Sequence, residues 1–354
     1  TAIGGTDAAG IGGGDSGSGG TFSTGENGNA VILASSISDQ SGKASTSTTP
    51  WSGLILEKNS AGNYEGSVYG TTVTPTENFE IPSGAAATIL AGKTLALADG
   101  ITMGLSGTLT DLGTLKVGDK GVLDINGTAG TLTVGDTAGG SGAAGTLENR
   151  GAVNVKNGGS LIVAAAGNAA NLEKTESGTG STGSGTGSGT GTSASGTKGT
   201  LTIEDGGTVV KRDQAAPVLN AADIATDNTT VTLKAVPDDI SHGSAKYGYA
   251  ASFGASAGAV TWTADGSNTI TGLTDPRAYY FYEMYDETDY YNASAASVGI
   301  AGDTQPGSDY TQELYLANKN AAGSAAVAGS FTISGIFADT AAGTETGTGS
   351  GTGT

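Results

Sequence analysis

The densest group of side chains that could do chemistry lies in one short tyrosine-rich run, Tyr282–Tyr291. Carboxylate oxygens are the ligands that Ca²⁺ prefers, and tyrosine rings can stack on sugar rings. The run therefore offers weak calcium candidates and glycan-contact candidates: the acids Glu283, Asp286, Glu287 and Asp289, and the tyrosines Tyr282, Tyr285, Tyr290 and Tyr291. We favour a plainer interpretation, in which the tyrosines are core residues or cross-strand partners at the end of a strand.

Acids also recur through the Gly-rich middle of the chain, where a catalytic site would need several of them to converge with a Lys or Arg. The candidates are Asp99, Asp111, Asp119, Asp124, Asp136 and Glu148. We expect most of them at corners of the chain, where Asp is a turn former first. The nearby cations are Arg150 and Lys156. His242 is the only histidine and cysteine is absent, which excludes multi-histidine metal sites and thiol chemistry. We predict a protein that is not an enzyme.

Composition and charge limit the kinds of partner that the chain can have. The formal net charge is −19, and a phosphate-binding surface needs clustered Lys and Arg, so we expect no nucleic-acid partner. No apolar run approaches the roughly 20 residues that cross a bilayer, so we expect no membrane span. Glycine supplies 63 of 354 residues, and the first residue is Thr1 rather than Met. We interpret the chain as a processed, exported protein with many tight corners between short strands.

A five-residue repeat is the strongest signal in the sequence. Its pattern, G-x-[LV]-x-[VIL], gives a short strand with alternate apolar residues. The repeat occurs at 113–117, 121–125, 130–134, 151–155, 159–163 and 199–203. A longer block, 107–125, aligns without a gap to 145–163. Repetition on this scale indicates strands that stack on similar strands.

The repeat predicts a parallel β-solenoid over residues 81–215. Three strands for each coil of about 20–25 residues would bury their apolar faces only by stacking. An antiparallel sandwich with fortuitous spacing is the alternative. Residues 1–80 hold further strand candidates and are interpreted as early coils, and the Gly/Ser/Thr-rich stretch 177–199 as a solvated insertion.

The pattern changes after the repeats. Segment 230–236 alternates apolar and polar residues, as antiparallel strands do. The run 272–285 contains a leucine, a proline turn and a strand that starts with tyrosine. It resembles the E–F corner of fibronectin type III and related sandwiches, with either Tyr279 or Tyr280 at the corner. The resemblance implies an Ig-like or fibronectin III-like β-sandwich over 216–300, so the expected fold class is all-β.

The last stretch, 301–354, holds two strand candidates, residues 313–317 and residues 330–338, and the second lies between Gly- and Thr-rich stretches. Four of its residues are apolar and β-prone: Phe331, Ile333, Ile336 and Phe337. Such a strand can complete a sheet in a neighbouring subunit, which would build a head-to-tail homo-oligomer or filament. The alternative is that it completes the chain's own sandwich.

Residues 7–20 and 29–57, with Gly92–Leu95 and the G-T-L units after it, resemble Gly-rich, β-helical cell-surface proteins of anaerobic Gram-positive bacteria. The resemblance covers roughly residues 1–215 and implies a stalk-like β-solenoid with Ig-like modules, a secreted or cell-surface location and no catalytic residue. We therefore expect an extracellular structural or adhesive protein that self-assembles. A carbohydrate-binding surface protein is the alternative, and a β-helical polysaccharide lyase or hydrolase comes third.

Overall fold

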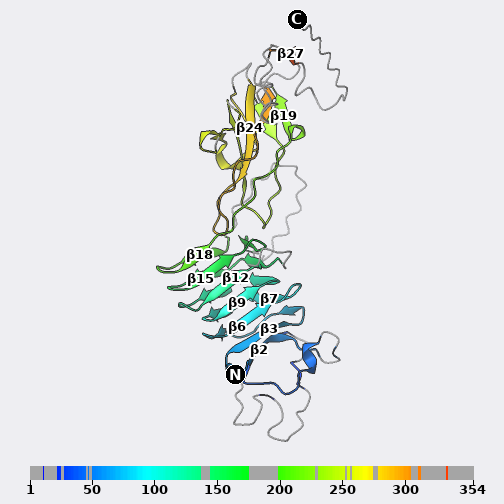
Figure 1. Ribbon diagram of the computed structural model, residues 1–354, viewed down its shortest axis with the longest axis vertical. Coiled ribbons are helices and arrows are strands. Elements are labelled where there is room, and N and C mark those ends of the chain that lie inside the picture. The colour runs from blue at the N-terminus through cyan, green and yellow to red at the C-terminus, as the bar shows by residue number, and fades with distance from the viewer. Residues whose placement is uncertain are drawn as a thin grey trace, which may run out of the picture. The chain divides into compact units, whose positions relative to one another are not determined.

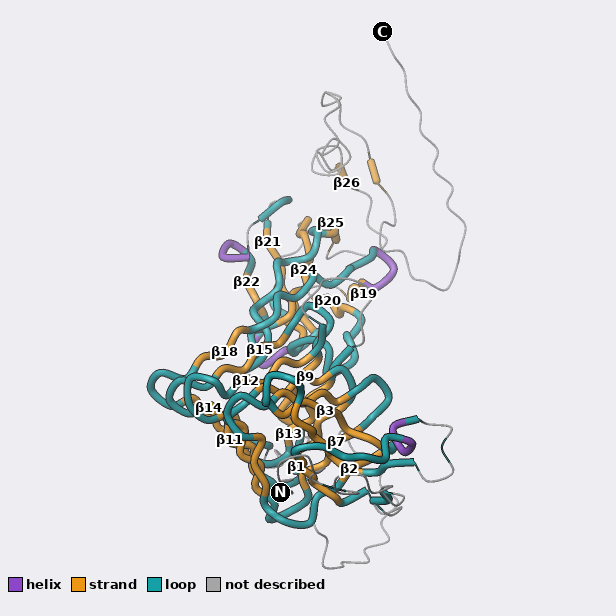
Figure 2. Tube along the Cα trace, turned by 60° about the horizontal axis from the view of Figure 1, so that its bottom comes forward, coloured by secondary structure: helices purple, strands orange, loops and turns teal. Residues whose placement is uncertain are grey.

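In the computed structural model, the regular secondary structure of the described chain is almost entirely β-strand (Figures 1 and 2). It describes residues 11, 22–24, 28–44, 47, 50–136, 144–174, 198–227, 230–251, 253–255, 257–273, 278–303, 310–311 and 332–333. The chain divides into two compact units. The first comprises Thr1–Asp213 and Asp289–Tyr291, and the second comprises Gln214–Thr288 and Asn292–Thr354.

The described part of the first unit consists of short strands and a single 3-10 helix. Its elements are β1(Ala30–Ala34), η1(Ser41–Lys43), β2(Gly53–Lys58), β3(Tyr64–Tyr69), β4(Thr72–Val73), β5(Phe79–Ile81), β6(Ala86–Ile89), β7(Thr94–Leu97), β8(Thr102–Leu105), β9(Thr108–Asp111), β10(Thr114–Val117), β11(Val122–Ile125), β12(Thr131–Val134), β13(Thr146–Asn149), β14(Ala152–Val155), β15(Ser160–Val163), β16(Asn168–Asn171), β17(Thr200–Ile203) and β18(Thr208–Val210). Every match to the five-residue repeat contains a strand, which confirms that part of the prediction.

Successive strands of the first unit visit three sheets in turn. Among the described residues the first sheet has the order β1-β2-β3-β6-β9-β12-β15-β18, the second β16-β13-β10-β7-β4 and the third β17-β14-β11-β8-β5. From β3 onward all neighbouring strands run parallel. Figure 1 shows the first sheet stacked in this order. The expected all-β class is confirmed.

Alternating burial explains how these strands make a core. In β7, Leu95 and Leu97 are buried and the other two residues are half-buried, as in a strand with one inward face. Register keeps equivalent residues in line, because Leu95 pairs with Leu115 of β10, which pairs with Leu147 of β13. All of these residues belong to one core cluster. Two inward residues in each strand cannot form a core alone, so the stack supplies it.

The glycine that opens each repeat is required by a close approach between stacked corners. A Cβ on Gly113 would lie 2.3 Å from the carbonyl oxygen of Lys93, and one on Gly151 would lie 2.2 Å from that of Gly121. The same carbonyl of Lys93 accepts a hydrogen bond from the Thr114 N–H at 2.9 Å. The glycine therefore lets one corner approach the backbone beneath it, which any side chain would prevent.

The ungapped match between 107–125 and 145–163 relates strands of different sheets. Its first strands are β9, in the first sheet, and β13, in the second. The hydrogen-bonded neighbours of β13 are instead β10 and β16. The repeating unit is therefore one strand with its corner, and the sequence match does not give the stacking register.

The described part of the second unit contains antiparallel sheets. Its elements are η2(Ala221–Asp223), β19(Ile224–Asp227), β20(Thr230–Leu233), β21(Ala245–Ala250), η3(Ala257–Ala259), β22(Thr261–Trp262), η4(Ala264–Gly266), β23(Thr269–Ile270), β24(Ala278–Tyr285), β25(Ile300–Asp303), β26(Tyr310–Thr311) and β27(Thr332–Ile333). The sheet orders are β19-β20-β23, β22-β21-β24-β25 and β26-β27.

Strand β24 is buried on both faces. Tyr279 and Phe281 share a cluster with Val231 of β20, so the two larger sheets have a common core. Tyr280 and Tyr282 point the other way, into a second cluster. Both candidates for the corner tyrosine are therefore buried, and the predicted turn at 274–277 lies outside the described residues.

Candidate functional site

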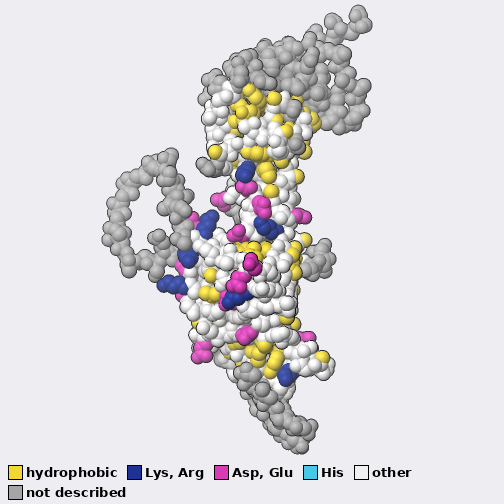
Figure 3. Space-filling view, turned by 90° about the vertical axis from the view of Figure 1, so that its left-hand side faces the viewer, with side chains coloured by type: hydrophobic (Ala, Val, Ile, Leu, Met, Phe, Trp, Pro, Cys, Tyr) yellow, Lys and Arg dark blue, Asp and Glu magenta, His cyan; other side chains and the backbone are white. Residues whose placement is uncertain are grey.

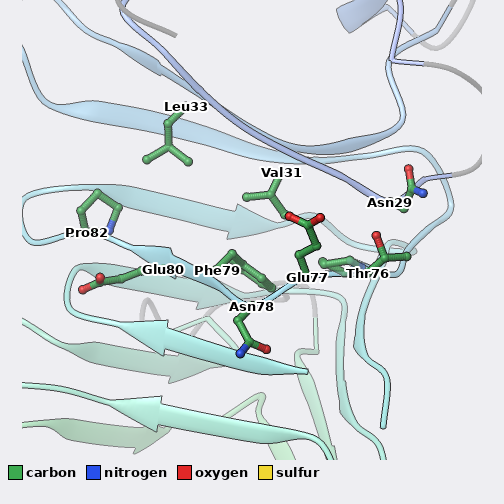
Figure 4. Close-up of a pocket in the computed structure, with 10 residues that line it drawn as sticks. Asn29, Val31, Leu33, Thr76, Glu77, Asn78, Phe79, Glu80 and Pro82 are labelled. Carbon is green, nitrogen blue, oxygen red and sulfur yellow. The ribbon is translucent and has the colours of Figure 1, made fainter. Parts of the chain in front are cut away.

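A cleft of about 470 Å³ lies where the sheets of the first unit begin. It is lined by β1, by β5 and by the segment that connects β4 to β5. Figure 4 shows Val31 and Leu33 on one side and Phe79, Glu80 and Pro82 across from them. All the lining residues belong to the first unit.

Unequal sheet lengths create this cleft. Strands β3, β4 and β5 follow one another in the chain, and each lies in a different sheet. The first sheet continues beyond β3 through β2 and β1, whereas the other two end at β4 and β5. Within the described residues, the two extra strands thus have no strand opposite them. Their inward face overhangs the end of the stack.

A hairpin between β2 and β3 produces the overhang. Gly62 has a φ of +84°, and the side-chain oxygen of Asn59 accepts hydrogen bonds from the N–H groups of Ala61 and Asn63, at 3.0 Å each. These are residue types that favour a tight turn. As a result β2 runs antiparallel to β3, and β1 pairs with β2 in parallel. The region interpreted as early coils therefore begins with two strands that run against those that follow.

Five of the ten residues that line the cleft are apolar. Val31, Leu33 and Phe79 are only partly buried, and all three pack against the main core cluster of the unit. Ile32, between the first two, faces the opposite side and packs near Trp51. The cleft is thus an open end of the core, and covering it would remove apolar surface from water, which stabilises an association.

The rim of the cleft is acidic and polar. Glu77, Asn78 and Glu80 are exposed there. Ser106 Oγ donates to Glu80 Oε1 at 2.6 Å, and Asn78 Oδ1 accepts from the Thr102 N–H at 2.8 Å, so two rim residues are held against β8 and its end. None of the lining residues is Lys or Arg. The rim therefore favours a neutral or cationic occupant over an anionic one.

Strand β5 leaves one edge unpaired beside the cleft. In the described chain its only ladder partner is β8. The Ile81 carbonyl accepts from the Ser106 N–H at 2.9 Å, so the backbone groups of Ile81 face β8 and those of Glu80 face the unpaired side. A free edge next to apolar side chains suits recognition of an extended segment by backbone hydrogen bonds and side-chain burial.

The calcium candidates do not converge. Asp286 pairs with Lys246 Nζ at 2.8 Å, and Asp289 accepts from Asn171 Nδ2 at 2.6 Å. Glu287 is exposed. Glu283 is buried, and desolvation raises its pKa to about 7. Across the described residues, no three acidic or histidine side chains gather as a metal site requires.

The glycan-contact candidates are mostly buried. Tyr282, Tyr290 and Tyr291 are each 1% exposed, which leaves their ring faces no access to a sugar. Tyr285 is half-buried, and its ring stacks on that of His242 with centroids 4.2 Å apart. Burial of this kind fits the interpretation as core and cross-strand residues and counts against a glycan surface here.

Tyr290 and Tyr291 were grouped with the sandwich by sequence, but they belong to the core of the first unit. Tyr291 Oη accepts from the Ala169 N–H of β16 at 2.8 Å, and Tyr290 Oη donates to Asn171 Oδ1 at 2.8 Å. The Arg212 guanidinium lies 4.6 Å from the Tyr291 ring centroid. Burial raises the pKa of Tyr290. No local pattern signals this return of the chain to the first unit.

The acids of the repeat region have structural partners. Asp124 pairs with Lys156 at 2.8 Å, and Glu148 pairs with Lys116 at 3.1 Å. Asp111 forms the expected turn, since its Oδ1 accepts from a backbone N–H two residues on at 3.0 Å. It is nevertheless fully buried, and desolvation raises its pKa to about 7. That burial differs from the expectation for a residue at a corner of the chain.

The predicted assembly strand is described only in part. Phe331, Ile336 and Phe337 lie outside the described residues. Ile333 lies in β27, whose two residues pair with the two of β26.

Comparison with protein-family models, with curated proteins and with solved structures finds nothing that matches this chain. None of the described helices has the length and apolar character needed to cross a membrane. The resemblance to Gly-rich surface proteins therefore stays a prediction.

Proposed function

We propose that this chain is an extracellular structural or adhesive protein that associates with copies of itself through its strand edges. The observation that carries the proposal is an edge of β5 that no described strand pairs with, beside a cleft whose apolar part includes Val31, Leu33 and Phe79. An exposed edge offers N–H and C=O groups that another chain can complete. The adjacent apolar side chains, Val31 and Leu33, would be buried in the same step.

The architecture that suits this role is a parallel β-solenoid joined to an Ig-like or fibronectin III-like β-sandwich. For the first unit, the support is the regular visit of successive strands to three sheets, with Thr94 and Thr114 in register 20 residues apart. For the second, it is the common core of two antiparallel sheets. A stacked architecture lengthens by adding similar strands, which suits a stalk or a fibre component.

The charge of the chain also supports an exported protein. The net charge of −19 resists non-specific aggregation between copies. On the face shown in Figure 3, acidic and basic side chains of the first unit are interspersed rather than separated into patches. Association between such surfaces then depends on backbone pairing and apolar contact more than on opposite charge.

Sedimentation velocity and negative-stain electron microscopy of the full chain over a range of concentrations test this function. We expect species larger than the monomer whose share grows with concentration. The control is Leu90→Asp, which alters an exposed apolar residue outside the cleft and should assemble normally. Monomers at every concentration would contradict self-association as the function.

A further inference from the structure

We infer that the cleft at β5 receives residues 330–338 of a second copy as an added β-strand. The inference rests on the proposed function, because it names the partner segment of the same site. The cleft sets the requirements: an extended segment, apolar on alternate residues, and without negative charge. The backbone groups of Glu80 would pair with it, and Val31 and Leu33 would contact its inward side chains.

Residues 330–338 meet these requirements. Phe331 and Ile333 alternate with Thr332 and Ser334, which is the period of a strand with one apolar face. Residues 321–338 contain no charged side chain, so the segment brings no like charge to the rim at Glu77 and Glu80. A segment with several carboxylates would be repelled there.

Two residues of the segment form a strand in the part of the chain that the structure describes. Thr332–Ile333 is the strand β27, and it pairs only with the two residues of β26 in the described structure. An isolated two-stranded pair is marginally stable in water. Docking in the cleft would replace this short pairing by backbone bonds to Glu80 and by contacts with Val31 and Leu33.

The chain's own N-terminal segment is a poorer occupant. Its apolar residues Ile11 and Phe22 already pack around Trp51, with the Phe22 and Trp51 ring centroids 5.3 Å apart. The rest of residues 1–27 is Gly-rich and carries Asp7, Asp15 and Glu26. If residues 1–27 docked in the cleft, those acids would add like charge beside Glu77 and Glu80.

Two complementary variants of the full chain test the inference. Ile333→Asp places a charge on the donated segment and leaves the cleft intact. Glu80→Pro removes the N–H on the free edge of β5, where Pro is tolerated, and leaves the segment intact. Glu80→Gln is the matched control, since it removes the same carboxylate but keeps the N–H. Circular dichroism and the thermal midpoint of each variant establish that it folds.

Alone, Ile333→Asp and Glu80→Pro should each sediment as monomers at concentrations where the wild type and Glu80→Gln assemble. A 1:1 mixture should form dimers and nothing larger, because one variant can only receive a strand and the other can only donate one. A mixture that stays monomeric, or either variant assembling like the wild type, would overturn the inference. If the wild type itself never assembles, the proposed function fails instead, so the two failures are distinguishable.

Discussion

The two units bury their strands in different ways. In the first, four-residue strands bury two residues each and depend on the strands above and below, as when Leu123 of β11 lies between Met103 and Val153. In the second, the eight-residue strand β24 fills clusters on both of its faces. Stability in the first unit is thus spread over many similar contacts, and in the second it is concentrated in one strand.

A stack of strands has two ends that need covering, whereas two packed sheets can cover each other. Each end of the first unit solves this problem differently. At β16, the hydroxyl of Tyr291 accepts from the Ala169 N–H, so a side chain occupies the outer edge. At β5, no strand of the described chain pairs with the outer edge. An interaction site is expected where the stack is left incomplete.

The largest expected effect is the loss of stability when one core residue is truncated in each unit. Phe281→Ala, in β24, should lower the free energy of unfolding by about 4 kcal/mol, because it empties the shared core of two sheets. Leu123→Ala, in β11, should cost about 3 kcal/mol. Hydrogen exchange read by peptide mass should show each loss mainly in the mutated unit. Equal loss of protection in both units would show that they unfold as one.

Two glycine substitutions test whether the close approach of stacked corners, and not only turn conformation, sets the stability cost of replacing glycine in the first unit. Gly151→Ala should cost about 3 kcal/mol, because its Cβ would meet two backbone oxygens, 2.2 and 2.3 Å away. Gly92→Ala is the control: its φ is +73°, but nothing lies within 4 Å of the added Cβ, so about 1 kcal/mol is expected. Thermal midpoints measure both. Equal costs would remove close approach as the reason for the repeat's glycine.

Among the described residues, each unit contains one buried acid, which allows a comparison by pH. Burial raises the pKa of Asp111 and of Glu283 to about 7, so the folded state keeps protons that the unfolded state releases above about pH 4. Each acid should therefore lower the free energy of unfolding as pH rises from about 4 to 7, by up to about 4 kcal/mol, with no further change above.

Denaturation of the wild type, Asp111→Asn and Glu283→Gln at pH 5 and pH 8 isolates these contributions. Each variant should lose less stability between the two pH values than the wild type does. Asn149, which the ungapped repeat match aligns with Asp111, shows that an amide can be buried at this position. If a variant is as sensitive to pH as the wild type, that acid is not protonated in the folded state.

The smallest expected effect concerns the outer edge of β16, which the side chain of Tyr291 occupies. Tyr291→Phe should cost about 1 kcal/mol, because the Ala169 N–H loses its acceptor while the ring stays in the core. Tyr249→Phe, on a half-buried tyrosine of β21, is the control and should cost less. Hydrogen exchange at β16 should accelerate only in Tyr291→Phe. Unchanged exchange there would mean that the hydroxyl does not protect this edge.

The sequence predicted strands well and their partners poorly, for a physical reason. Alternation and glycine spacing are local, so the five-residue repeat located β10, β11 and β12. Which sheet a strand joins depends on the lengths of the corners between strands. The repeat match aligned the sequences of β9 and β13 although the two strands lie in different sheets.

The candidate site could not be predicted for a related reason. Val31 and Leu33 have the pattern of any strand, and only the reversal at the Asn59–Asn63 hairpin leaves them opposite nothing. The return of Tyr290 and Tyr291 to the first unit is a long-range contact with no local signature. The apolar segment at 330–338, by contrast, was visible at once, because it depends only on residue types.

The most direct test of the central claim is hydrogen exchange of the peptide that covers β5, measured in the full chain at low and high concentration. Strand addition predicts that exchange at Glu80 slows as concentration rises and that Ile333→Asp abolishes the slowing. Protection of β17, where Ile203 is exposed at the other end of the same sheet, would instead indicate that copies stack end to end. Protection that rises at β17 while β5 stays unchanged, or no change at either strand, would contradict the account.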